Sequence, residues 1–77
     1  MALSTIVVEA GRYRHYKGNE YEVIGMARHS ETREMMVVYR PLYGASGLWV
    51  RPAAMFVEDV VVGGKTQPRF VRLYDLD

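Results

Sequence analysis

Three short stretches of this sequence bring aromatic rings and guanidinium groups together: Arg12-Tyr13-Arg14-His15-Tyr16, Tyr39-Arg40 and Trp49-Val50-Arg51. Arginine stacks on aromatic rings and pairs in a bidentate way with carboxylates and phosphates. A surface of such residues binds a peptide, stacks the bases of single-stranded nucleic acid, or encloses a methylated cation. The alternative is that Tyr13, Tyr39 and Trp49 are core residues, because a small domain needs its large rings for packing. At this level both interpretations stay open.

Acid–base chemistry would depend on the two histidines, His15 and His29. His29-Ser30-Glu31 contains the residue types of a hydrolytic triad, but a triad needs side chains that converge from separate elements. A polar turn, in which Ser30 and Thr32 bond the local backbone, is the preferred interpretation. No catalytic residue is therefore predicted.

Metal and phosphate sites find no support in the spacing of the residues. His15, His29 and Glu31 lack any local pattern typical of metal ligands. The glycine-rich stretches at 44–47 and 63–65 lack the flanking residues of a phosphate-binding loop and are better interpreted as turns. No metal and no cofactor is predicted.

Length and composition are typical of a small soluble domain. The 77 residues predict a single domain, 1–77. The absence of cysteine excludes a disulfide framework and a thiolate metal site. We expect a cytoplasmic location, because there is no signal-peptide pattern and no apolar run near the roughly 20 residues that span a bilayer. The net charge of +1 gives no bulk attraction to nucleic acid or to a membrane.

Short apolar runs between polar turns indicate strands. Residues 20–28 alternate in character, which is typical of a half-buried strand. Residues 51–56 predict one helical turn, of the 3-10 type, with Pro52 near its start. Residues 1–10 are expected to form an extra strand or an arm. The remaining predicted strands lie at 11–16, 34–42, 47–51, 58–62 and 69–74, the last two as a hairpin.

These elements predict an all-β fold, a small SH3-like barrel of five to six short antiparallel strands with one 3-10 turn. Closure into a barrel would remove the exposed edges that a small open sheet cannot protect. An open, strongly bent sheet is the alternative.

The orientation of Trp49 has two interpretations. Leu48 and Val50 are expected to point inward, which would present Trp49 and Arg51 on the outside. In the other interpretation Trp49 covers the open end of the barrel, and Arg51 pairs with one of the acids at 58–59.

Two long stretches, GRYRHYKGNEYEVIGMARHSET and VVYRPLYGASGLWVRPAAMF, resemble a small bacterial family known as domain of unknown function sixteen-fifty-three. The resemblance runs from about Gly11 to Phe70, and the family-like core is placed at 11–74. Its most specific elements are YRHYKG, HSET, YRPLYG, WVRP, Met55-Phe56 and PRF. The family brings no established activity, so the resemblance implies one compact domain and leaves the function open.

Most of these distinctive segments fall in turns and their flanks, where binding residues concentrate. We expect the HSET turn and the connection before WVRP to meet at one rim of the barrel. The predicted binding patch comprises His15, Tyr16, His29, Ser30, Glu31, Thr32, Tyr39, Arg40, Tyr43, Trp49 and Arg51.

The leading hypothesis is a non-enzymatic binding module that recognises a peptide or a protein partner, a second copy of the chain included. One alternative is a small-molecule sensor or an enzyme that uses His15 or His29. No membrane partner is expected. The other alternative is a nucleic-acid-binding barrel whose phosphate contacts are Arg12, Arg14, Arg40, Arg51, Arg69 and Arg72.

Overall fold

Seven strands and one helical turn make up the part of the chain that the computed structural model describes, residues 6–44 and 47–74. In chain order they are β1 (Gly11–His15), β2 (Glu20–Arg28), β3 (Met35–Pro41), β4 (Trp49–Pro52), α1 (Ala53–Phe56), β5 (Asp59–Val62), β6 (Lys65–Pro68) and β7 (Phe70–Leu73).

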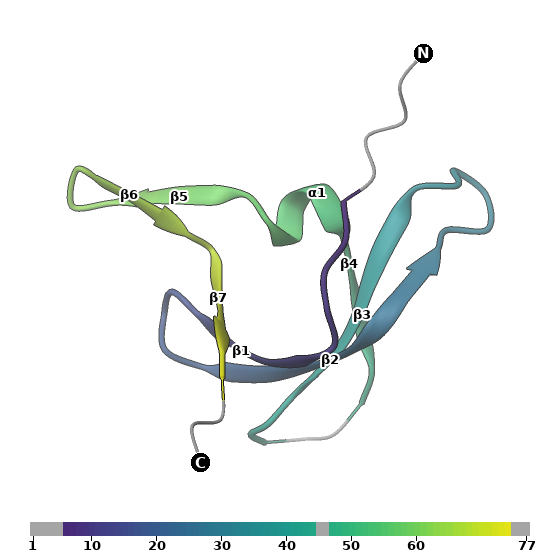
Figure 1. The fold of residues 1–77 in the computed structure, drawn as a ribbon, viewed down its shortest axis with the longest axis horizontal. Helices are drawn as coiled ribbons and strands as arrows, with labels where there is room; N and C mark the ends of the chain where they lie inside the picture. Colours follow the sequence, from purple (N-terminus) through teal and green to yellow (C-terminus); the bar gives the residue numbers. More distant parts are fainter. Residues whose placement is uncertain (1–5, 45–46, 75–77) are drawn as a thin grey trace.

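Five of the strands form one antiparallel sheet in the order β4-β3-β2-β1-β7, and β5 pairs with β6 in a separate hairpin. A β-bulge between Val23 and Gly25 shifts the register of β2 against β3, and such bulges bend a sheet. Figure 1 shows the result: the sheet curves, β7 and β4 rise at its two ends, and α1 lies across its open side.

The core lies between the curved sheet and α1. Phe56 of α1 stacks on Phe70 of β7, with ring centroids 4.0 Å apart and planes 3° from parallel. Tyr13 and Tyr39 contact the Phe56 ring edge-on. We call the face of the sheet that carries these rings the inner face. The other buried residues of the core are Val8, Tyr21, Val23, Val37 and Ala53.

The outer face of the sheet carries charge, because strand residues alternate between the two faces. Arg14 Nη2 lies 3.3 Å from Glu20 Oε2 across β1 and β2. Arg40 Nε donates a hydrogen bond of 2.8 Å to Glu22 Oε1 across β2 and β3. Such exposed pairs contribute at most about 1 kcal/mol each, so the inner face supplies most of the packing.

The prediction of an all-β fold is confirmed, but the closed barrel is wrong. In the described residues β4 and β7, at the two edges of the sheet, are not neighbours in any ladder. The helical turn is α rather than 3-10, and residues 6–44 and 47–74 form seven strands rather than five or six. The open, strongly bent sheet that was the alternative is the architecture observed.

Two local predictions also need correction. The last hairpin joins β5 to β6 through Gly63 and Gly64, whose φ angles of 58° and 78° suit a two-residue turn. Strand β7 instead pairs with β1. Residues 6–10 contain no strand: Val8 is buried in the core of the same chain, and Ile6 packs against it. Residues 1–5 lie outside the described part.

Candidate binding site

Tyr21 stands at the centre of a group of rings on the inner face. Its ring centroid lies 5.5 Å from that of Tyr39, 5.8 Å from Tyr43 and 6.2 Å from Trp49. Strand pairing explains the gathering, because Tyr39 lies opposite Trp49 on β4 and His15 lies opposite Phe70 on β7. We call this set the Tyr21 cluster: His15, Tyr16, Tyr21, Tyr39, Tyr43, Trp49 and Phe70.

The Tyr21 cluster has a buried floor and an accessible rim. Tyr21, Tyr39 and Phe70 are buried, with exposed fractions of 8%, 3% and 8%. Trp49 and Tyr43 each keep 46% of their surface exposed. The floor therefore belongs to the core, while the rim offers ring surface to a ligand.

Hydroxyl groups hold the Tyr43 side of the rim in place. The Tyr21 and Tyr43 hydroxyl oxygens are 3.0 Å apart, and Asn19 Nδ2 donates a hydrogen bond of 3.3 Å to Tyr43. Burial, followed by the hydrogen bond with Tyr43, raises the pKa of Tyr21 to about 12. Tyr21 therefore stays protonated at neutral pH and joins the loop after β3 to strand β2.

Lys17 Nζ lies 5.8 Å from the centre of the Tyr16 ring, and the second cation of this site is Arg51. Its Nε donates a hydrogen bond of 3.3 Å to the Tyr39 hydroxyl, and its guanidinium carbon lies 5.7 Å from the centre of the Phe70 ring. Within the described residues no carboxylate pairs with Arg51. The expected pairing with an acid at 58–59 is not observed, because Glu58 pairs with Arg69 at 3.0 Å. A half-buried guanidinium is thus left with its charge uncompensated.

Nearby positive charges affect the pKa of His15. Burial lowers its pKa first, and then the nearby charges of Arg51, Arg69 and Lys17 lower it further. The backbone N–H of Lys17 donates to His15 Nδ1 at 3.2 Å, which requires an unprotonated Nδ1. His15 is therefore neutral at pH 7 and presents its remaining ring proton on Nε2.

The structure brings part of the predicted patch together. His15, Tyr16, Tyr39, Tyr43 and Trp49 belong to the Tyr21 cluster, and Arg51 lies beside it.

Five predicted residues lie elsewhere. Arg40 is on the outer face, paired with Glu22. The HSET turn joins β2 to β3 next to the Arg28–Met35 pair, whereas the Tyr21–Pro41 pair is at the other end of that hairpin (Figure 1). The shared rim is therefore wrong for His29, Ser30, Glu31 and Thr32.

The HSET turn is bonded to its own backbone as a polar turn, but through His29 and Thr32 rather than through Ser30 and Thr32. His29 Nδ1 accepts hydrogen bonds of 3.1 and 3.2 Å from the backbone N–H groups of Glu31 and Thr32. Thr32 Oγ1 accepts one of 3.2 Å from Glu34 N–H. These contacts satisfy backbone donors within the turn itself.

The expected orientation of β4 is half right. Trp49 and Arg51 do share a face, but it is the inner one, because Trp49 pairs with Tyr39. Leu48 and Val50 were expected inward and are instead 65% and 58% exposed. Trp49 reaches solvent because it lies on an edge strand.

Sequence reasoning missed Tyr21 and Phe70 as members of the site. Tyr21 was interpreted only as one position of an alternating strand. Its signal is a long-range one, since it contacts rings from β1, β3, β4 and β7. Local periodicity carries no information on such contacts.

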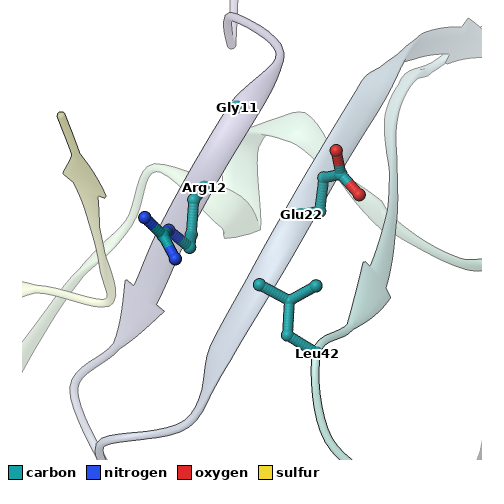
Figure 2. Close-up of a pocket in the computed structure, with 4 residues that line it drawn as sticks. All are labelled: Gly11, Arg12, Glu22 and Leu42. Carbon is teal, nitrogen blue, oxygen red and sulfur yellow. The ribbon is translucent and has the colours of Figure 1, made fainter. Parts of the chain in front are cut away.

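A separate open depression of about 390 Å³ lies on the outer face. Its lining residues are Gly11, Arg12, Glu22 and Leu42, from β1, β2 and the segment after β3 (Figure 2). Arg12 and Glu22 are opposite one another in the β1–β2 ladder, with the inner-face residues Tyr13 and Tyr21 next to them in sequence. The depression is therefore distinct from the Tyr21 cluster.

The described residues contain no group of three or more His, Cys, Asp and Glu side chains that could hold a metal ion. None of their helices is long and apolar enough to cross a membrane.

Comparison with known proteins gives one family and one solved structure. Residues 11–72 match the model of a family described as protein of unknown function (DUF1653). The structure is similar to the crystal structure of a protein belonging to DUF1653 from Bordetella bronchiseptica, with a TM-score of 0.81 and 39% identity over 91% of this chain and 92% of that chain. No curated protein matches the chain.

Proposed function

This chain belongs to DUF1653, a family of proteins of unknown function, and we propose that it is a non-enzymatic binding module. The rim of the Tyr21 cluster, together with Arg51, recognises a segment of a protein partner. We also propose that the protein is cytoplasmic and that its binding surface is SH3-like, in the sense that one face of a small bent sheet presents it.

One observation carries this function: half-exposed Trp49 and Tyr43 stand over buried rings, beside an arginine that has no carboxylate partner within the described residues. Trp, Tyr and Arg are the residue types most enriched among those that dominate protein–protein binding energy. Buried neighbours hold these side chains in place, so less freedom is lost on binding.

Nucleic-acid binding has less support. Arg14, Arg40, Arg69 and Arg72 each pair with a glutamate of the chain itself. Phosphate contacts by these arginines would compete with the existing pairs, and the net charge is only +1. Arg51 by itself cannot contact the successive phosphate groups of a nucleic-acid backbone.

An enzyme or sensor that uses His15 also has less support. The side chains whose charges act on His15 are all cations, which disfavours its protonated form. A general base of the usual kind is oriented and made more basic by a carboxylate. His15 is better suited to donate one hydrogen bond as a neutral ring.

Trp49 is the single tryptophan of the chain, so its fluorescence is the direct test. We expect a blue shift or a change in intensity on titration with suitable peptides, at low and at high salt, because a ligand on the rim removes Trp49 from water. Peptides, oligonucleotides and small metabolites are compared on the same chain. A response to oligonucleotides alone, abolished by salt, selects nucleic-acid binding instead.

The matched control is Arg40→Gln, because Arg40 is an exposed arginine on the outer face. It should leave the response to peptides unchanged. If Arg40→Gln weakens binding as much as Arg51→Gln does, the ligand does not sit on the Tyr21 cluster, and the proposed function is wrong.

A further inference from the structure

Resting on the proposed function, we infer that the recognised segment is acidic: one carboxylate docks on the Arg51 guanidinium, and an adjacent apolar side chain lies on Trp49 and Tyr43. The class of ligand is thus a peptide with Asp, Glu or a free C-terminus next to an apolar residue.

The geometry of Arg51 favours a carboxylate. Its hydrogen bond to Tyr39 uses Nε, so the Tyr39 hydroxyl fixes the plane of the group and leaves the two terminal nitrogens for a ligand. Those nitrogens together form a fork that matches the two oxygens of a carboxylate. The Phe70 ring beneath the guanidinium keeps it from turning toward the interior.

The charge of the surroundings excludes the opposite ligand, a methylated cation. An aromatic cage attracts a cation through its ring faces. Here the rings are accompanied by Arg51, and Lys17 Nζ lies 5.8 Å from the centre of the Tyr16 ring. A cation would enter a region that is already positive, whereas an anion would relieve it.

The amount of charge favours a carboxylate over a phosphate. Arg69 is already neutralised by Glu58, with a separation of 3.0 Å. Lys17 lies over the Tyr16 ring, whereas Arg51 supplies about one uncompensated positive charge beside Tyr39 and Phe70, which matches a single carboxylate there. A phosphate monoester carries a charge of about −1.5 to −2 at pH 7 and calls for further donors.

The rings supply the second half of the recognition. Tyr43 is held by Tyr21 and Asn19, and Trp49 is held between Tyr21 and Tyr39. Both leave nearly half of their surface exposed, and Trp49 shares a face of β4 with Arg51. An apolar side chain next to the carboxylate would cover this surface while the carboxylate reaches Arg51.

The first experiment selects a library of random peptides, with both free and amidated C-termini, on the immobilised chain and on Trp49→Ala. We expect sequences that are enriched on the wild type, lost on Trp49→Ala, and marked by a carboxylate next to an apolar residue. Enrichment of sequences without a carboxylate overturns this inference and leaves the binding module standing. Enrichment that is no greater than on Trp49→Ala overturns the proposed function itself.

The second experiment measures the dissociation constant of the best peptide and of its Glu→Gln or Asp→Asn counterpart. Loss of the carboxylate should weaken binding to the wild type by roughly 10- to 100-fold, and by much less for Arg51→Gln. Equal losses in both proteins would place the carboxylate away from Arg51. Because this change is made in the peptide, a folding defect cannot imitate it.

Two further variants separate charge from position. Tyr39→Phe removes the hydrogen bond that orients Arg51 but keeps its charge, so it should weaken binding less than Arg51→Gln. Arg40→Gln should leave the affinity unchanged. Inorganic phosphate and a phosphoserine counterpart of the peptide are tested in the same way. If either binds more tightly than the carboxylate peptide, the site is assigned to phosphate instead.

Discussion

The guanidinium carbon of Arg51 lies 5.7 Å from the centre of the Phe70 ring, and these two residues belong to the two edge strands of the five-stranded sheet, β4 and β7. The two edge strands of the bent sheet thus meet through a side-chain contact, and no ladder of backbone hydrogen bonds joins them in the described residues. Arg51 and Trp49 keep part of their surface exposed, whereas a ladder between the two edges would enclose them.

Phe56 should be the main anchor of α1. It is 2% exposed and stacks on Phe70 at 4.0 Å. Phe56→Ala should lower the free energy of unfolding by about 3–5 kcal/mol, because it leaves a cavity between α1 and β7. Urea denaturation measures the loss. Met55→Ala, at a position 44% exposed on the same turn, is the control and should cost far less.

His15 should titrate below its usual pKa of about 6.5, because burial, Arg51, Arg69 and Lys17 disfavour its charged form. Since the unfolded chain then binds a proton at His15 more readily than the folded one, the contribution of His15 to stability should be constant above about pH 6.5 and fall as the pH drops below it. Histidine NMR titration and urea denaturation at several pH values measure both effects.

Arg51→Gln should move the pKa of His15 upward, because Arg51 is the leading charge that acts on it. Binding of an acidic peptide should also raise the pKa of His15. The affinity for the peptide should therefore rise as the pH falls below about 6.5, where His15 takes up its proton. His29→Gln is the matched control and should leave the titration of His15 unchanged. A pKa of His15 that does not respond to Arg51→Gln contradicts this account of the site.

Tyr21 should limit stability at alkaline pH. Its folded pKa is about 12, against about 10 in an unfolded chain. The neutral form is favoured in the folded state, so stability should fall as the pH rises through about 10 to 12. Denaturation series at alkaline pH measure this fall. Tyr21→Phe should reduce it, whereas Tyr74→Phe, at a position 70% exposed, should not.

Gly11 should resist substitution. Its φ is 144°, and a Cβ there would lie 2.9 Å from Arg72 Nη2, whose guanidinium packs on Tyr13 and Tyr74. Gly11→Ala should cost on the order of 1–3 kcal/mol, from backbone strain and displacement of Arg72. Thermal unfolding measures it. In Gly25→Ala the added carbon meets nothing within 4 Å, so that variant should be nearly neutral.

Local features of the sequence were enough to predict several elements. The alternation of residues 20–28 predicts β2 with the observed ends, and Gly18, in the turn before it, has a φ of 106° that glycine adopts without strain. Trp49 and Arg51 share a face, as alternation requires. These features depend on backbone geometry within a few residues, which residue type governs directly.

Tertiary pairing decided the rest. Alternation shows that Trp49 and Val50 point opposite ways, but only the pairing of Trp49 with Tyr39 shows which of them faces the core. A shift of one residue in that register would exchange the two faces, and Leu48 and Val50 are apolar enough to suit either side. The bend of the sheet then brings Arg51 over Phe70, residues 19 positions apart in the chain. Composition alone could name the rings and the arginines; the register and the bend decide which of them meet.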